Sequence, residues 1–208
     1  MEAREGFSQL LRNFPNHDAG WLEAGHLCRQ QAQHAQARIC YAKAIELKPD
    51  RVDARLSMAR LLEDQGDFDA GAVEYHRALL AGGAAQARLV HWRMAKCRIE
   101  RGDAARALES MRQALLVLRS MPTPIDDNER AEMQTDLGDI FMRLGMTEEA
   151  HRAFERASLG TSEATLSRLA ELSFRYNLWH EAQAVLRRNV ELHPDSHTAH
   201  WNLAHALA

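Results

Sequence analysis

The sequence predicts an all-α protein built from stacked helix pairs, and two observations support that prediction. Strong helix formers (Ala, Leu, Arg, Glu and Gln) dominate the composition, and only 5 prolines and 11 glycines interrupt them. The chain also repeats itself, because Tyr41 and Ala44 are followed 34 residues later by Tyr75 and Ala78. A period of this length is typical of a solenoid, in which each helix pair buries its apolar face by stacking on its neighbours.

The first complete repeat shows the pattern most fully. A large residue is followed four positions later by a small one; the next helix carries alanine, an aromatic residue and alanine, and a proline comes after it. These positions are Trp21, Gly25, Ala37, Tyr41, Ala44 and Pro49. The pattern resembles the tetratricopeptide repeat (TPR), a helix-turn-helix unit of about 34 residues. The resemblance implies a right-handed α–α superhelix of about five repeats, with a half repeat at each end.

The resemblance covers nearly the whole chain, which we interpret as a single TPR solenoid over residues 1–208. Arg55 and Asn189 depart from the pattern, since a large and a small residue are expected there. The linkers at 81–85 and 121–128 are too short to argue for separate domains. The expected boundaries are a half repeat at 1–15, repeats at 18–51, 52–85, 88–121, 131–162 and 163–196, and a half repeat at 197–208.

Small and large residues at fixed places predict how the helices pack. Gly25 and Gly138 occupy slots where two helices must cross closely, and aromatic side chains fill the remaining volume. Trp21 and Trp179 fall at such packing slots, so we expect both in the core.

The C-terminal end predicts a segment of a longer bacterial TPR protein. Terminal repeats of a solenoid carry a polar outer face, but the last helix keeps Trp201, Leu203 and Leu207. The alternative is a short protein that self-associates through its uncapped terminal helices.

Composition excludes several classes of partner and compartment. The net charge of −3 lacks the basic excess of a nucleic-acid binder. No apolar run is long enough to insert into a membrane, and the N-terminus carries no secretory signal. We therefore expect a cytoplasmic protein, or a periplasmic one if it belongs to a larger exported protein. Cys28, Cys40 and Cys97 lack paired spacing, which favours reduced thiols in a helical core.

The TPR resemblance implies that the first helix of each pair lines a concave groove for a protein or peptide. Trp92 and Trp201 fall one residue beyond the packing slot, toward that groove, and an exposed tryptophan beside arginine is typical of a binding hot spot. The alternative for both is partial burial against the neighbouring repeat. The predicted partner-binding residues are Leu22, His26, Arg29, Leu56, Arg60, Trp92, Arg93, Lys96, Asp139, Glu171, Phe174, Arg175 and Trp201.

Charge along this groove suggests the kind of peptide. Arg60, Arg93 and Lys96 make the first half basic, whereas Asp136, Asp139 and Glu171 make the second half more acidic. Two signs suit an extended peptide with its own charge asymmetry. The alternative is an ordinary solvated surface of mixed charge.

Two known TPR specialisations do not match. Of the five positions that form the two-carboxylate clamp of chaperone-tail binders, only Arg93 agrees. The asparagine ladder of the glycosyltransferases that transfer N-acetylglucosamine is also absent, since only Asn202 stands at a ladder position.

The sequence offers no chemistry of its own. Nucleotide-binding, metalloprotease and serine-hydrolase motifs do not occur. His197 and His200 share a helix face but lack a third metal ligand at a matching offset. We therefore expect no catalytic residue, metal or cofactor, and a protein-interaction scaffold rather than an enzyme. The alternatives are the substrate-recognition arm of a larger glycosyltransferase, sulfotransferase or hydroxylase, and a component of bacterial envelope or exopolysaccharide machinery.

Overall fold

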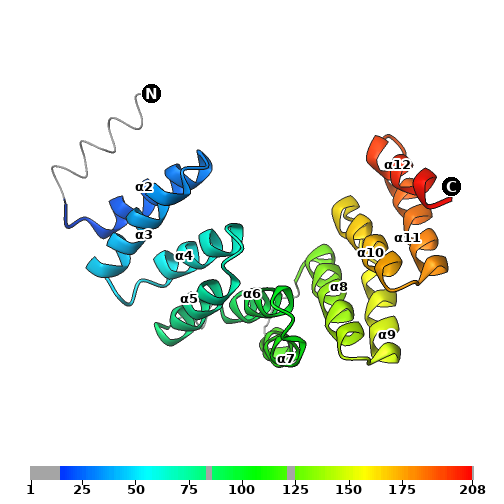
Figure 1. Ribbon diagram of the computed structural model, residues 1–208, viewed down its shortest axis with the longest axis horizontal. Coiled ribbons are helices and arrows are strands. Elements are labelled where there is room, and N and C mark those ends of the chain that lie inside the picture. The colour runs from blue at the N-terminus through cyan, green and yellow to red at the C-terminus, as the bar shows by residue number, and fades with distance from the viewer. Residues whose placement is uncertain (1–14, 83–85, 121–124, 208) are drawn as a thin grey trace. The chain divides into compact units, whose positions relative to one another are not determined.

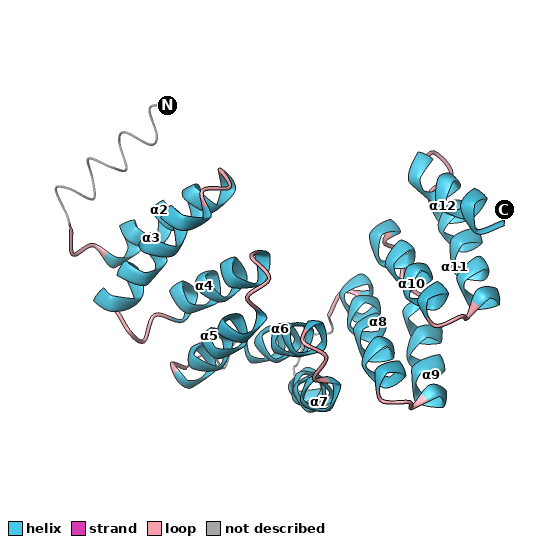
Figure 2. Cartoon of the chain, in the orientation of Figure 1, coloured by secondary structure: helices cyan, strands magenta, loops and turns pink. Residues whose placement is uncertain are grey.

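In the computed structural model, the regular elements of the described residues are all α-helices (Figures 1 and 2). The structure describes residues 15–82, 86–120 and 125–207. Apart from Pro15, the predicted N-terminal half repeat lies outside these residues, as do parts of both predicted linkers.

The chain forms two compact units, an N-terminal unit over residues 1–117 and a C-terminal unit over residues 118–208. Consecutive helices pack in pairs within each unit. The N-terminal unit contains α2 (Asp18–Gln30), α3 (His34–Leu47), α4 (Val52–Asp64), α5 (Phe68–Leu80), α6 (Ala87–Glu100) and most of α7 (Ala104–Ser120). The C-terminal unit contains α8 (Asp127–Arg143), α9 (Thr147–Ala157), α10 (Glu163–Arg175), α11 (Trp179–Leu192) and α12 (His197–Leu207).

Two glycines show how closely the paired helices approach. A β-carbon on Gly25 would lie 2.4 Å from the ring of Tyr41, and one on Gly138 would lie 2.3 Å from the ring of Phe154. Neither distance leaves room for a methyl group, so the aromatic ring occupies the space that a side chain would take. The predicted close crossings at these glycines are therefore confirmed.

The turn inside each helix pair repeats the same backbone geometry. Its middle residue has a positive φ, and the residue after it donates its amide to a carbonyl five positions earlier, which closes the first helix. Glycine, which adopts positive φ without steric cost, supplies this residue in three pairs, whereas Ala32 and Asn177 supply it in the others. The five turn residues are Ala32, Gly66, Gly102, Gly145 and Asn177.

The prediction for the two tryptophans at packing slots is half right. Trp21 is half-buried against the core of the N-terminal unit, and its indole nitrogen donates to the carbonyl of Pro15 over 2.8 Å. The expectation that Trp179 lies in the core is wrong, because its side chain is 57 % exposed. Trp179 is the first residue of α11, where the helix has just left the turn and only one side of the indole meets a neighbour, Phe174.

The cysteines agree with the expected reduced core thiols. Cys40 and Cys97 are buried, Cys28 is half-buried, and none forms a disulfide. Burial raises the pKa of Cys40 to about 11, which keeps this thiol protonated and unreactive near neutral pH.

The turn geometry predicts opposite effects for two alanine–glycine exchanges. Ala32→Gly should stabilise the protein by about 1 kcal/mol, because the positive φ of 56° strains an alanine but not a glycine. Gly66→Ala, at the matching turn, should destabilise it by a similar amount, since nothing lies within 4 Å and backbone strain is the only cost. Urea unfolding measures both changes. Shifts of the same sign in the two variants would contradict the explanation.

The three tyrosines predict a delayed alkaline titration. Burial raises the pKa of Tyr41 and of Tyr176 to about 12, and raises that of Tyr75 further, from an ordinary value of 10.0. The folded state therefore holds the phenol protons more tightly than the unfolded state, so stability is retained below pH 10 and lost as the pH rises above it. Tyrosinate absorbance of the native protein should be nearly absent at pH 10, whereas the guanidinium-unfolded chain should be half ionised there. Half-ionisation of any native tyrosine at pH 10 would refute this prediction.

Candidate partner-binding site

In the N-terminal unit, polar side chains of α2, α4 and α6 pair with one another. His26 Nε2 lies 2.9 Å from Ser57 Oγ, and Arg29 donates to Asp64 over 2.8 Å. Arg93 donates to Glu63 over 3.2 Å. Three predicted binding residues thus lie along one row of first helices, each already bonded to a neighbouring first helix. Partly exposed pairs of this kind contribute little stability and mainly align the helices.

The other two predicted cations of this unit lie nearby on the same helices. Arg60 of α4 is half-buried, and its Nε has no hydrogen-bond partner among the described residues. The Lys96 ammonium lies 5.7 Å from the centre of the Trp92 ring, a cation–π contact within α6.

Four predicted binding residues are buried: Leu22, Leu56, Trp92 and Asp139. The expectation that Trp92 is exposed is wrong, because only 5 % of its surface is accessible, and burial is the alternative that holds. The reason lies in α6 as a whole, which buries Val90, Met94 and Ile99 as well. Burial spread around so much of the helix leaves only a narrow accessible strip, and Trp92 does not lie on it.

Asp139 is part of a buried polar cluster rather than an acidic groove surface. Its carboxylate accepts hydrogen bonds from Arg143 Nε, over 3.3 Å, and from the Tyr176 hydroxyl. The neighbouring Asp136 is also buried and lies 2.5 Å from Arg168. Both carboxylates are thus neutralised inside the unit, so the expected acidic character of this half rests on Glu171 alone.

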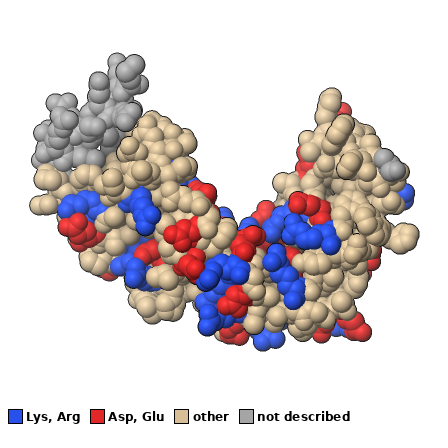
Figure 3. All heavy atoms as spheres, in the orientation of Figure 1, with Lys and Arg blue, Asp and Glu red and all other residues tan. Residues whose placement is uncertain are grey.

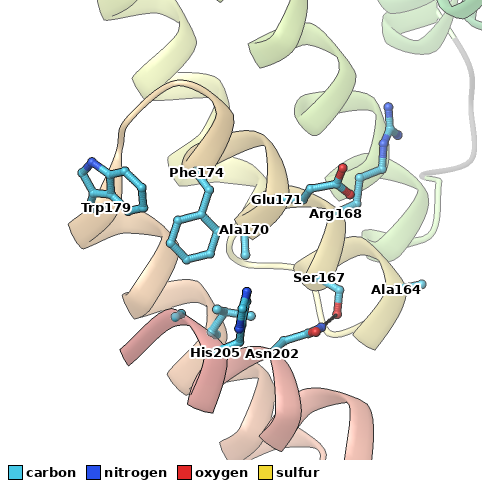
Figure 4. A pocket seen from close by; sticks show the side chains of 11 residues that line it. Ala164, Ser167, Arg168, Ala170, Glu171, Phe174, Trp179, Asn202 and His205 are labelled. Carbon is cyan, nitrogen blue, oxygen red and sulfur yellow. Dashed lines mark hydrogen bonds between the residues drawn. The ribbon is translucent and has the colours of Figure 1, made fainter. Parts of the chain in front are cut away.

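Two of the remaining predicted residues, Glu171 and Phe174, line a cavity between α10, α11 and α12 (Figure 4). Its volume is about 780 Å³, within the range of ligand-binding clefts. We call this cavity the C-terminal pocket. Glu171 and Phe174 line it, Arg175 pairs with Glu171 over 3.4 Å, and Trp201 on α12 is 72 % exposed outside it. The full lining is Ala164, Ser167, Arg168, Ala170, Glu171, Phe174, Trp179, Leu186, Asn202, His205 and Ala206.

One wall of the C-terminal pocket is aromatic. The Phe174 and Trp179 rings lie 5.5 Å apart at a tilt of 55°. Figure 4 shows Phe174 and His205 pointing into the cavity from α10 and α12, with Trp179 at its edge. Tilted aromatic pairs at this spacing are attractive and present a rigid apolar surface.

Another part of the pocket wall, nearer the start of α10, is polar. Asn202 on α12 donates to Ser167 Oγ on α10 over 3.5 Å, as the dashed line in Figure 4 marks. The buried Asn189 of α11 donates to the same hydroxyl over 3.1 Å and to the Glu163 carbonyl over 3.5 Å. Asn189 occupies the slot where a small residue was expected, and its amide holds α10 and α11 together beneath the pocket.

Sequence reasoning missed Ser167, Trp179 and Leu186 as pocket residues. A signal for the first was present, since Ala164, Ser167, Glu171 and Phe174 follow a helical spacing of three and four along one face of α10. Trp179 was assigned to the core from its slot alone, and nothing in the spacing indicated that the start of α11 leaves it open.

Other kinds of site are not indicated by the described residues. They contain no group of three or more His, Cys, Asp or Glu side chains able to hold a metal ion. None of the helices in this part of the chain has the length and apolar character needed to cross a bilayer. Figure 3 shows acidic and basic side chains interspersed over the face in view.

Stacked helix pairs with a repeated turn define an α-helical repeat protein, and comparisons with known proteins identify the repeat. Tetratricopeptide-repeat models match residues 19–51 and 56–122. The structure resembles YrrB, described as a TPR protein with an unusual peptide-binding site, with a TM-score of 0.65, 16 % identity and 98 % of each chain covered. It also resembles a thermophilic TPR protein of Thermus thermophilus, with a TM-score of 0.65, 18 % identity, and 91 % of this chain and 98 % of that one covered.

A curated relative is the general transcriptional corepressor ssn6 of Schizosaccharomyces pombe, 24 % identical over 163 residues. The match covers 74 % of this chain but spans only 14 % of that protein.

The chain contains tetratricopeptide repeats, and the predicted all-α TPR fold is confirmed. TPR arrays are scaffolds for protein–protein interaction and are generally not enzymes, so the expected class of function and of partner holds at that level.

The burial of Trp92 reverses the expected behaviour of its alanine variant. Trp92→Ala should lower the free energy of unfolding by about 3–5 kcal/mol, because it removes a buried indole and leaves a cavity. Trp201→Ala is the matched control and should change it by less than about 0.5 kcal/mol, since that indole is exposed. Urea unfolding followed by circular dichroism compares the two. A Trp92 variant as stable as the control would contradict the burial of Trp92 and indicate an exposed side chain.

Proposed function

We propose that the C-terminal unit binds an extended peptide segment of a protein partner in the C-terminal pocket. The observation behind this proposal is the cavity itself, where aromatic and polar side chains line the space between the first helices of two successive repeats. YrrB, whose fold is similar, is described as having a peptide-binding site, which supports this class of ligand.

The aromatic wall suits an apolar anchor side chain of the peptide. Trp179 is more than half exposed although it contacts Phe174, so a bound side chain would remove a large apolar area from water. Tryptophan is enriched among residues that dominate binding energy, especially where a pocket excludes water around it.

The polar wall suits the main chain of the same peptide. The Asn202 amide can make about three further hydrogen bonds beyond the one to Ser167, and both side chains reach the cavity. An extended peptide carries a donor and an acceptor on each residue, so a fixed amide can bond it irrespective of sequence. Glu171 adds a carboxylate to the pocket lining, and Arg175 and Trp201 add contacts outside the pocket, in keeping with their predicted role.

The N-terminal unit has a secondary role in this proposal. His26, Arg29 and Arg93 are engaged in bonds between helices, so a ligand must displace those bonds before it gains new ones. The substrate-recognition arm of a larger enzyme and a component of envelope machinery would use the same pocket and differ in which protein the pocket recruits.

Peptides selected on the intact chain test this proposal. A phage-displayed random peptide library is panned on the protein, and selected peptides are titrated by fluorescence anisotropy. Trp179→Ala should weaken their binding at least about tenfold, and Asn202→Ala about threefold to tenfold. Leu159→Ala, an equally exposed apolar residue of the same unit outside the pocket, is the control and should leave binding unchanged. Peptides that bind the Trp179 variant as tightly as the wild type would place the binding site elsewhere.

A further inference from the structure

A second surface lies in the N-terminal unit. It centres on the second helix of a pair, whereas the predicted groove is lined by first helices. Two grooves adjoin there along α5, the second helix of its pair. One, of about 530 Å³, lies between α5 and the α6–α7 hairpin; the other, of about 490 Å³, lies between α5 and the α3–α4 side. Val73 and Arg77 line both grooves, so the two form one continuous surface, which we call the α5 surface.

The α5 surface has an unusually open apolar stripe. Val73 is 48 % exposed and Leu80 is 75 % exposed, one on each side of Arg77 along the helix. Residues at this spacing lie on one helix face, and Met94 and Met58, which are largely buried, line the grooves at either side. Contiguous exposed apolar side chains rimmed by polar ones mark sites of protein interaction.

The α5 surface is net positive, whereas the whole chain is net negative. Five arginines line the two grooves against three carboxylates, although the whole chain carries a net charge of −3. The carboxylates are Asp69, Glu74 and Asp103; the arginines are Arg38, Arg77, Arg98, Arg101 and Arg106.

Two arginines of the α5 surface are held weakly enough to exchange partners, whereas Arg77 pairs with Glu74 on its own helix. Arg101 pairs with Asp69, and Arg106 lies 3.4 Å from Asp103, but these side chains are largely exposed to water. Exposed ion pairs are worth at most about 1 kcal/mol, so a partner's carboxylates can replace the internal ones. Arg98 is fixed differently, since it donates to the Ser110 hydroxyl and to the Arg106 carbonyl and thus anchors the rim of the groove.

We propose that the α5 surface docks an amphipathic helix whose apolar stripe is flanked by aspartate or glutamate. The described part of this unit has no strand edge to which a peptide could add, whereas a groove between helices accepts another helix by ridge-into-groove packing. The apolar stripe of the partner would cover Val73 and Leu80, and its acidic flanks would meet Arg77, Arg101 and Arg106. This site shares no residue with the C-terminal pocket.

Two designed peptides test the proposal on the full chain. Both are fluorescein-labelled, about 18 residues long so that a helix can form, and carry the same leucine stripe. One has glutamate beside the stripe and the other has lysine. By fluorescence anisotropy, the glutamate peptide should bind at least about tenfold more tightly than the lysine peptide, and added salt should reduce the difference.

Charge reversal locates the binding. Arg77→Glu combined with Arg101→Glu should weaken the glutamate peptide at least about tenfold and give the lysine peptide the advantage. Arg152→Glu, an exposed and similarly paired arginine on α9, is the matched control and should leave both affinities unchanged. Leu80→Ala should weaken both peptides, because it removes part of the stripe that they share.

Four outcomes would overturn the proposal. Equal affinity for the two peptides would mean that the arginines do not select acidic flanks. Unchanged binding in the double variant would mean that the peptide binds elsewhere. Competition by single-stranded RNA that the double variant abolishes would assign the surface to nucleic acid. A wild-type dimer in size-exclusion chromatography that the double variant converts to a monomer would assign it to a second copy of the chain. Trp179→Ala leaves this binding intact if the proposal holds, so failure here and failure of the C-terminal pocket remain separate results.

Discussion

The structure depends on the contact between a residue without a side chain on one helix and an aromatic ring on the next. At Gly25 and Gly138 the ring of Tyr41 or Phe154 fills the place of a β-carbon, so the distance between the paired helices is fixed by the thickness of a ring. In these two pairs the contact therefore also sets where the first helix lies against the second.

Much of the fold was predictable because these contacts are local in sequence. The glycine and its aromatic partner lie 16 residues apart in both pairs, so a period and a pattern of sizes reveal them directly. Solvent exposure was less predictable, because it depends on neighbours that the period does not encode. Trp179 falls at a packing slot and Trp92 one residue beyond one, so the pattern predicts a buried Trp179 and an exposed Trp92. In the structure Trp92 is buried and Trp179 is exposed. Asp139 is predicted to be a surface charge, but it is buried and accepts a hydrogen bond from Tyr176 on the following repeat.

The two units show two ways of using the same helix faces. In the N-terminal unit, side chains long enough to span the gap between first helices bond across it, as Arg29 and Arg93 do. In the C-terminal unit, Arg168 and Tyr176 likewise bond to α8, but the faces of α10 and α12 that meet at the pocket carry Ala164, Ser167 and Ala206, which are too short to fill the space. The cavity therefore results from small side chains on a rigid frame rather than from a distortion of the repeat. This explains why partner preference can change within the family without a change of fold.

Asn189 has a consequence that extends beyond packing. This wholly buried amide holds the Ser167 hydroxyl, which in turn receives the bond from Asn202 at the pocket wall. The orientation of the ligand-facing groups is thus relayed from a residue that no ligand can touch. During evolution, a change of partner therefore need not involve a surface residue. A substitution of the buried asparagine by alanine would restore the ordinary repeat and free the Ser167 side chain to adopt another orientation.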